Sequence, residues 1–409
     1  MAARKAGELL REGAARHGRG ELAAAEALYR QVLALDPGEP NAHNLMGVLA
    51  RQRGAPEQAL RHTERALARS PEAPVFLANH GAALAEAGRL AEAVAHLRAA
   101  LARRPEDAVS LRNLGQALCA LGDARAAAAP LEQAVRLDPG GAAPWLALAH
   151  ARRELGEAAA ALAAARAALA RAGGDAALAG QARFLLAALG EGAAPDRAPA
   201  EYVRDLFDQF APRFEAELTE RLAYRTPEAL AALVEAVAAP RGVVVLDLGC
   251  GTGLSGTALA PFAARLEGLD LSPRMLAEAG KRGLYAALHA ADLVEFLPSR
   301  PGAYGLVAAV DVLNYLGDLA PALAGMAQAL APGGLAAFSV EAGAGAPFAL
   351  GEGMRYRHDP VHVAGLAAAA GFTELARQEA VLRQEKGRPV AGVLFVLRRG
   401  AAGPTSPPP

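Results

Sequence analysis

Apolar and small residues in the first half of the chain recur with a period of 34 residues. Four series coincide, so each unit predicts a helix, a glycine turn, a second helix and a proline-bearing turn. Small residues fall where two helices would cross, because only Gly or Ala leaves room for close backbones. The pattern predicts an α-helical superhelix over residues 6–175 and a capping helix at 176–190. The series are Pro37, Pro71, Pro105 and Pro139; Gly13, Gly47, Gly81 and Gly115, followed by Ala149; Gly20, Gly54, Gly88, Gly122 and Gly156; and Ala25, Ala59, Ala93, Ala127 and Ala161.

In the second half, apolar runs of strand length alternate with helical stretches. This alternation predicts an α/β domain with a doubly wound parallel sheet at 201–399. Residues 191–200 lack periodicity and hold two prolines, so we expect a linker there, after a repeat domain at 1–190. The last residues, 400–409, are expected to form a disordered tail. The strand-like runs are VVVLDLG, LEGLD, YAALHA, LVAAVDVL and LAAFSVE.

The composition of the chain indicates the cellular compartment in which we expect the protein. Hydrophobic residues make up 53% of the chain, but the excess is Ala, and no run is long and Gly-free enough to span a bilayer. The first residues lack an apolar core, so no signal peptide is expected. The two cysteines, Cys119 and Cys250, are too few and too distant for a disulfide framework or a zinc site. These features favour a cytoplasmic protein without a membrane partner.

The charge balance argues against nucleic acid as a partner. The net charge is −1, with a surplus of four positive charges in residues 1–190 and of five negative charges in 191–409. Neither half carries the basic excess that phosphate binding demands.

The 34-residue unit, with Leu111 and Trp145 at its large-residue position, resembles the tetratricopeptide repeat, five copies of which would fill 6–175. Such arrays present a concave groove, usually for an extended peptide. Asn79 and Asn113 hold the same repeat position, where similar arrays use an asparagine ladder to bond a peptide backbone. Alternatively, the groove residues are merely solvated and the groove docks only the chain's own catalytic domain. The expected groove residues are Asn41, Asn44, Arg51, Asn79, Arg112, Asn113, Gln116, His150 and Arg153.

The segment from Val243 to Gly253 reads as a buried strand that ends in a glycine turn and opens a helix near Leu254. The glycines permit close backbone approach by a ligand, and the helix N-terminus offers free N–H groups. Gly251-x-Gly253-x-x-Gly256 also fits a dinucleotide fingerprint, but that pattern alone is weak.

Asp247 followed by Gly-Cys-Gly-Thr-Gly resembles instead the first motif of class I S-adenosylmethionine-dependent methyltransferases. In that family the loop holds the methionine part of the cofactor. An acidic residue at the strand end attracts the cation of this part, whereas it would repel a pyrophosphate. A carboxylate about twenty residues later, here Asp270, is placed to accept ribose hydroxyl hydrogen bonds. The resemblance adds Leu271 packing on the adenine, Asp292 near its amino group, and a fourth strand end facing the methyl group. For Asp292 the alternative is a helix N-cap. The expected cofactor residues are Asp247, Gly249, Cys250, Gly251, Gly253, Asp270, Leu271, Asp292, Leu293 and Asp311.

The acceptor side is less defined. The candidate catalytic residues are Tyr315, after the fourth strand, and Arg355 and His358, after the fifth. His358 could be a general base or a surface-loop histidine. Arg355 and Arg383 could bind a substrate carboxylate by bidentate hydrogen bonds. Aromatic residues at helical spacing in 202–214, followed by the segment 222–226, either pack on the domain or form a lid over the cofactor.

Several segments, including FDQFAPRF, AVDVLNYLGDL and MRYRHD, resemble a bacterial group of repeat-containing methyltransferases, which implies no particular substrate. The sequence therefore predicts an S-adenosylmethionine-dependent methyltransferase acting on a small molecule or on a peptide or protein that the repeats recruit. Methyl transfer requires no metal, and no residue cluster has metal-ligand spacing. A thiol mechanism is not expected, because Cys250 lies in the cofactor loop and Cys119 in a repeat. The alternative is an interaction scaffold or cofactor sensor with a non-catalytic methyltransferase fold.

Overall fold

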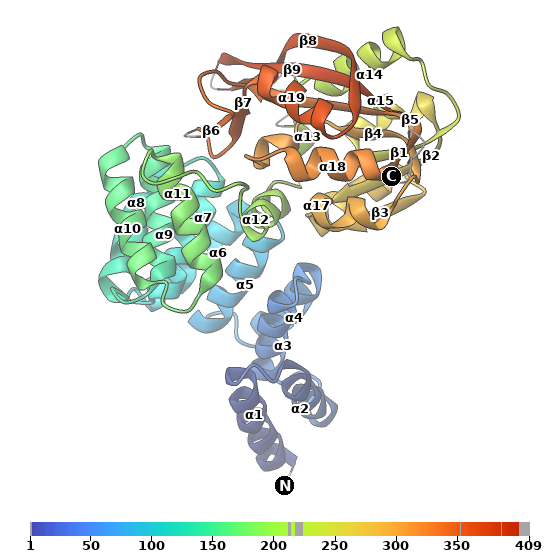
Figure 1. Cartoon of the computed structure of the whole chain (residues 1–409). Coiled ribbons are helices and arrows are strands. Elements are labelled where there is room, and N and C mark those ends of the chain that lie inside the picture. Colours follow the sequence, from blue (N-terminus) through green and yellow to red (C-terminus); the bar gives the residue numbers. More distant parts are fainter. Residues whose placement is uncertain (1, 212–213, 217–223, 352, 386, 401–409) are drawn as a thin grey trace, which may run out of the picture. The chain divides into compact units, whose positions relative to one another are not determined.

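The computed structural model (Figure 1) divides into two compact units, Met1–Ala182 and Arg183–Pro409. Of the expected tail at 400–409, residues 401–409 lie outside the described residues. Among the residues that the structure describes, no helix combines the length and apolar character needed to cross a membrane. The structure describes residues 2–211, 214–216, 224–351, 353–385 and 387–400.

The first unit consists of antiparallel helix pairs in series, which confirms the predicted repeat superhelix. The two helices of each pair pack against each other, and each pair packs against the next one. The division between the two units falls inside the expected capping helix, so the boundaries at 190 and 200 stay predictions. The helices are α1 (Ala2–Gly18), α2 (Leu22–Leu35), α3 (Pro40–Gln52), α4 (Pro56–Arg69), α5 (Pro74–Glu86), α6 (Leu90–Arg103), α7 (Ala108–Ala120), α8 (Ala124–Leu137), α9 (Ala142–Glu154), α10 (Ala158–Arg171) and α11 (Ala176–Ala188).

The recurring glycines mark helix crossings, as the sequence suggested. A Cβ added at Gly81 would lie 2.8 Å from Leu97 Cγ, and one at Gly115 would lie 2.3 Å from Leu131 Cγ. Any side chain there would force the two helices of the pair apart. Gly122, at the turn between α7 and α8, has a φ of 83°, a conformation that favours glycine.

Within its described residues, the second unit is built on a mixed nine-stranded sheet. Strands β3, β2, β1, β4 and β5 lie side by side and parallel, as predicted; β9 then pairs antiparallel with β5, and β8 with β9. The antiparallel edge and a short β6–β7 hairpin at the end of β5 had no counterpart among the predicted strands. The strands are β1 (Val243–Leu248), β2 (Ala263–Asp270), β3 (Ala287–Ala290), β4 (Tyr304–Ala309), β5 (Leu330–Ala342), β6 (Phe348–Leu350), β7 (Tyr356–His358), β8 (Phe372–Glu385) and β9 (Arg388–Arg399).

Helices cover both faces of this sheet (Figure 1). In β4, Leu306 and Ala308 pack in a core with α14 and α15, whereas Val307 and Ala309 pack in a core with α17, α18 and α19. Successive residues thus alternate between two buried faces, which explains why the strands read as continuous apolar runs. The helices are α12 (Ala200–Phe210), α13 (Phe214–Ala216), α14 (Thr226–Val237), α15 (Leu254–Leu259), α16 (Pro273–Lys281), α17 (Leu293–Phe296), α18 (Ala320–Ala329) and α19 (Pro360–Ala369), with 3-10 turns η3 (Ala260–Phe262), η4 (Leu297–Ser299) and η5 (Leu313–Tyr315).

Part of the segment expected as a linker is extended and packs on the second unit. The amide of Ala198 donates to the carbonyl of Tyr315 (2.9 Å), and the amide of Gly317 donates to the carbonyl of Asp196 (2.7 Å). Arg197 forms a single antiparallel bridge with Leu316. We call residues 195–198 the strap; it lies against the turn that follows β4.

Candidate functional site

The loop after β1 is shaped by glycines in left-handed conformations: Gly249 (φ 61°), Gly251 (φ 54°) and Gly253 (φ 89°). A Cβ at Gly249 would lie 2.4 Å from Val312 Cγ2, so internal packing accounts for that glycine. At Gly251 a Cβ would meet nothing closer than the Phe214 ring, at 3.5 Å. The left-handed φ, rather than crowding, accounts for this glycine, because the Phe214 ring lies at an ordinary contact distance from that position.

Asp247, near the end of β1, is a buried carboxylate with an unused oxygen. Its Oδ2 accepts hydrogen bonds from the hydroxyls of Ser255 and Tyr285, both at 2.7 Å. Its Oδ1 is buried and has no hydrogen-bond partner among the described residues. Burial raises the pKa of Asp247 to about 7, against the lowering effect of the two hydroxyls. A cationic ligand group at Oδ1 would supply the missing partner and stabilise the charged carboxylate.

Asp270, at the end of β2, connects that strand to the glycine loop. Its Oδ2 accepts from the amide of Gly251 (2.9 Å) and its Oδ1 from the amide of Ser272 (2.8 Å). Burial raises the pKa of Asp270 to about 6, and Asp208 adds to the rise while the amides oppose it. The structure thus brings Asp270 beside the loop, and the next residue, Leu271, is partly buried.

Asp292 has two structural roles. It is the N-cap of α17, accepting from the amide of Val294 (2.9 Å), as the alternative in the sequence analysis had it. It also forms a salt bridge with Arg197 of the strap, with Nη2 and Oδ2 2.8 Å apart. Its neighbour Leu293 is buried in the core beside α18. Contacts of Asp292 and Leu293 with a cofactor therefore stay predictions.

A cluster of charged residues, which we call the ion cluster, occupies the ends of β4, β5 and β8. Arg383, only 4% exposed, holds Asp311 through Nη1 at 2.8 and 2.7 Å from the two carboxylate oxygens. It also pairs with Glu341, and its Nε lies 2.7 Å from Glu385 Oε1. Asp311 itself has a φ of 58°, which aspartate tolerates better than most residues. Its carboxylate is therefore directed to Arg383.

Arg355 belongs to the same ion cluster. Its Nε lies 2.8 Å from Glu341 Oε1, and its Nη2 pairs with Glu385. Burial would raise the pKa of Glu341, but Arg383 and Arg355 bring it below its ordinary value. Two guanidinium groups thus face three carboxylates. This pairing opposes the hypothesis that Arg355 and Arg383 bind a substrate carboxylate, because such a ligand would have to displace Glu341 or Glu385.

His358, on β7, is 1% exposed, so the surface-loop alternative is wrong. Its Nε2 lies 2.8 Å from the carbonyl oxygen of Leu316 and 3.2 Å from that of Gly317, which fixes the proton on Nε2. Burial lowers the pKa of His358, in spite of these carbonyls. The lone pair of this neutral imidazole therefore lies on Nδ1, which is buried and has no partner among the described residues. An acceptor could not reach that nitrogen, so the general-base role stays a prediction that the burial opposes.

Aromatic residues link α12 to both sides of the site. Phe207 stands edge-on to Tyr315, with ring centroids 5.5 Å apart, and to Phe214, at 6.0 Å. Asp208 accepts from the hydroxyl of Ser272 (2.5 Å), at the N-terminus of α16. Burial raises the pKa of Tyr315, so its phenol stays neutral. Residues 212–213 and 222–223 of the expected lid lie outside the described residues.

Several functional side chains escaped the sequence analysis. Tyr285 and Ser255, which bond Asp247, belong to no motif that we singled out, and neither does Arg197. Glu341 ends the fifth predicted strand, so its position at a strand end was a usable signal. Glu385 lies on the antiparallel edge that the pattern did not reveal.

Residues 245–334 match the family model described as a methyltransferase domain, and residues 10–74 and 73–139 match two models described as tetratricopeptide repeats. The chain thus carries tetratricopeptide repeats followed by a methyltransferase domain, as the sequence predicted.

Curated relatives agree with the second assignment. Methyltransferase-like protein 27 of Homo sapiens is 38% identical over 112 residues, which cover 26% of this chain and 45% of that protein. The ubiquinone biosynthesis O-methyltransferase of Sodalis glossinidius is 33% identical over 102 residues, covering 24% and 41%. The chain therefore spans less than half the length of these relatives.

Two solved structures each match part of the chain. A thermophilic tetratricopeptide-repeat protein of Thermus thermophilus matches at 25% identity, covering 44% of this chain and 97% of that one, with a TM-score of 0.39. The N-methyltransferase NodS of Bradyrhizobium japonicum, in complex with S-adenosyl-L-homocysteine, matches at 22% identity, covering 42% and 86%, with a TM-score of 0.35.

Proposed function

We propose that the second unit binds S-adenosylmethionine at the ends of β1 and β2 and transfers its methyl group to an acceptor. The observation that carries this proposal is the buried Oδ1 of Asp247, which has no partner among the described residues and lies at the start of a loop of left-handed glycines. The amino acid part of the cofactor has an ammonium group that would pair with Asp247 Oδ1. It is also compact enough to lie against the backbone of the glycine loop. The pyrophosphate of a dinucleotide would meet an anion at the same place.

Each expected cofactor residue except Asp311, whose carboxylate pairs with Arg383, has a role in this proposal. Asp247 would hold the ammonium group, and the backbone from Gly249 to Gly253 would surround the methionine part. Cys250 would contribute backbone alone, because its thiol is buried in a core with Leu276. Asp270 would accept the ribose hydroxyls through lone pairs that its two amide donors leave available. On the adenine side lie Leu271, Leu293 and Asp292, the last held by Arg197.

When bound, the cofactor supplies a methyl group that its sulfonium already activates. The protein's task is then to orient the acceptor and exclude water. Phe207 and Tyr315 cover one side of the region with aromatic edges, and the ion cluster closes another with buried, fully paired charges. Since His358 is 1% exposed and its free nitrogen, Nδ1, is buried, we propose that transfer relies on positioning rather than on this histidine.

The acceptor is a small molecule or a peptide or protein delivered by the repeats. The ion cluster carries one carboxylate more than it has guanidinium groups, which favours a neutral or cationic acceptor over an anionic one. The competing function, a cofactor sensor without transfer, shares the binding site and differs in its product.

Isothermal calorimetry with Asp247→Asn tests the binding site. Loss of a charge-assisted bond should weaken S-adenosylmethionine binding by about tenfold or more. Glu278→Gln, which removes an exposed carboxylate on α16, is the matched control and should bind as the wild type does. Tight NAD binding, or an unchanged affinity of Asp247→Asn, would contradict the proposal. Incubation with labelled S-adenosylmethionine and cell extract then separates enzyme from sensor, because only the enzyme transfers label to an acceptor.

A further inference from the structure

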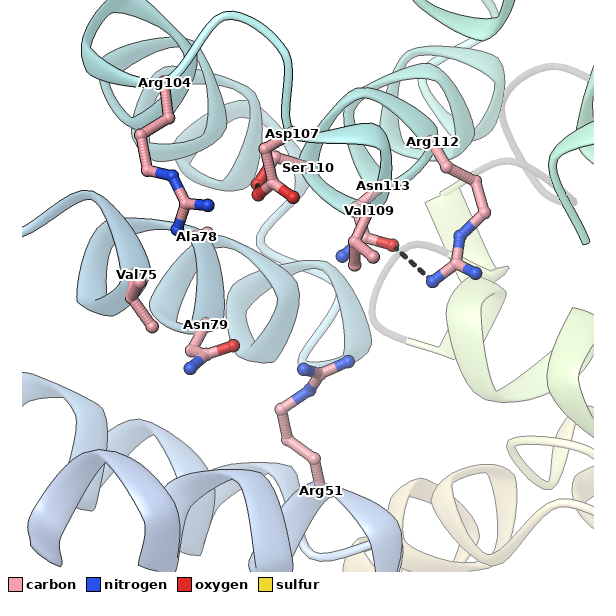
Figure 2. Close-up of a pocket in the computed structure, with 10 residues that line it drawn as sticks. All are labelled: Arg51, Val75, Ala78, Asn79, Arg104, Asp107, Val109, Ser110, Arg112 and Asn113. Carbon is pink, nitrogen blue, oxygen red and sulfur yellow. Dashed lines mark hydrogen bonds between the residues drawn. The ribbon is translucent and has the colours of Figure 1, made fainter. Parts of the chain in front are cut away.

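The first unit contains a polar hollow between helices α3, α5 and α7, shown in Figure 2, which we call the arginine hollow. It includes four of the residues that the sequence placed in the repeat groove: Arg51, Asn79, Arg112 and Asn113. Its lining combines cationic, amide and apolar groups. The complete set is Arg51, Val75, Ala78, Asn79, Arg104, Asp107, Val109, Ser110, Arg112 and Asn113.

Three arginines lie in the arginine hollow, but they differ in how they are paired. Arg51 already bonds Glu86, with Nη2 and Oε1 2.6 Å apart. Arg104 is exposed at the rim. Arg112 reaches from α7, where its Nη2 donates to Asn113 Oδ1 at 3.2 Å (Figure 2). The one acidic side chain in the lining, Asp107, accepts from the hydroxyl of Ser110.

Arg112 is a desolvated cation whose bonds are incomplete. Its Nε is buried and has no hydrogen-bond partner among the described residues. Burial lowers the pKa of Arg112, the charge of Arg51 lowers it further, and Asp138 opposes both. A buried donor without an acceptor and a cation beside another cation are both costly, so an anion bound here would be stabilised. A carboxylate matches the planar guanidinium.

The remaining groups fit a polypeptide. Val75 and Val109 are 44% and 56% exposed and stand exactly one repeat apart, each near the start of its helix. Large exposed apolar side chains at an inner surface offer contact to aliphatic side chains of a partner. The side-chain nitrogen of Asn79 donates to Asn44 Oδ1 (2.9 Å), and its side-chain oxygen can accept a hydrogen bond from a peptide N–H.

We infer that the arginine hollow binds an acidic peptide segment, with a carboxylate on Arg112 and a neighbouring aliphatic side chain against Val75 and Val109. This inference names the kind of partner for the repeats in the proposed function. A polyphosphate or nucleic acid fits less well, because Asp107 and Glu86 also border the site and limit the positive surplus to about one charge.

Fluorescence anisotropy on the full-length chain tests the inference. The probe is a labelled nine-residue peptide of alternating glutamate and valine, and its matched control has glutamine in place of glutamate. The acidic peptide should bind at least about tenfold more tightly. Arg112→Ala should remove most of this preference, whereas Arg98→Ala, on the exposed side of α6, should retain it.

A second variant guards against a folding defect. Val109→Asp places a negative charge on an exposed rim position, where the fold tolerates it, and should weaken the acidic peptide while leaving the glutamine peptide unchanged. Absence of any preference for the acidic peptide, including no binding of either, would overturn the inference. So would a preference that survives both Arg112→Ala and Val109→Asp. Titration of S-adenosylmethionine into the same proteins keeps this outcome separate from that of the proposed function.

Discussion

At the scale of single residues, two buried carboxylates lie side by side at the cofactor end of the sheet. Burial raises the pKa of Asp247 to about 7 and that of Asp270 to about 6. Both residues were expected from the sequence, because an acidic residue at a strand end beside a glycine loop is a local signal. Their raised pKa values were not, since these depend on what covers them in three dimensions.

The raised pKa of Asp247 predicts a pH dependence of cofactor binding. Below about pH 7 the carboxyl group becomes protonated and no longer attracts an ammonium group, so affinity should fall by up to about tenfold between pH 7 and 6. Calorimetry with S-adenosylmethionine at pH 6, 7 and 8 measures this, and Asp247→Asn should flatten the dependence over that range. Equal wild-type affinity at pH 6 and 8 is the opposing result.

The raised pKa of Asp247 gives the stability of the ligand-free protein the opposite dependence on pH. Between about pH 4 and 7 the folded chain keeps a proton on Asp247 that the unfolded chain releases, so stability should decline as pH rises through that window. A bound cation would lower the pKa of Asp247 and offset the decline.

His358 illustrates where sequence reasoning fails at this scale. A histidine grouped with Arg355 and Tyr356 after a strand resembles catalytic chemistry, but the chain buries it under the turn after β4. Its two carbonyl partners lie 41 and 42 residues away in the sequence, and no local pattern announces them.

For His358 we predict an effect on stability rather than on the pH–rate profile. His358→Ala removes the donor to Leu316 and Gly317, so it should reduce the free energy of unfolding by about 1–3 kcal/mol. Because the folded pKa is lowered, the wild type should also lose stability as pH falls below about 6.5. Urea unfolding of both proteins at pH 5.5 and 8 measures this. A hundredfold loss of turnover in a stably folded His358→Ala enzyme would restore the base hypothesis.

At the scale of elements, apolar runs located the parallel strands β1 to β5. Strands β1, β2, β4 and β5 are largely buried on both faces, whereas β3 is only partly buried. Strand β8 escaped because segments such as Arg377–Glu379 are polar and exposed. Strand β9, which lies between β5 and β8, is a buried apolar run that the prediction missed. The strap was not predicted for another reason. A segment with two prolines and no periodicity usually forms an irregular linker, so nothing in the sequence indicated that it packs on the domain. Its structure comes from backbone pairing with Tyr315–Gly317 and from the bridge between Arg197 and Asp292.

The strap leads to a prediction about local opening. Arg197→Ala removes the side-chain anchor but leaves the backbone bonds, so the amides of Gly317 and Asp318, which donate to Asp196, should exchange hydrogen faster. Because Arg197 is about two-fifths exposed, solvent screening limits the effect to under about 1 kcal/mol, or roughly fivefold.

Asp292→Asn provides the matched control, because asparagine still caps α17 while losing the charge pair. It should raise exchange as much as Arg197→Ala does, and the double variant should add little to either. Unaltered exchange at Gly317 in both variants would show that the ion pair does not hold the strap.

At the scale of the whole molecule, the period of 34 residues predicted the first half and the strand–loop–strand pattern predicted the second. Both signals depend on residues that are close together in the sequence. The arginine hollow and the cofactor site, however, are built from separate elements in separate compact units. No described side chain of one site belongs to the other, so two independent binding activities are expected.

The last prediction therefore concerns independence. Arg112→Ala should weaken the acidic peptide and leave S-adenosylmethionine affinity within about twofold, whereas Asp247→Asn should do the reverse. Calorimetry for the cofactor and anisotropy for the peptide, each with and without saturating amounts of the other ligand, give the full cycle. If the two ligands are coupled, linkage requires each to change the other's affinity by the same factor. If each ligand changed the affinity of the other by a factor of ten or more, the two sites would be coupled and the prediction of independence would be wrong. Under the proposed function the repeats recruit the acceptor, so Arg112→Ala should slow methylation of an acidic partner while turnover of a small surrogate stays at the wild-type rate.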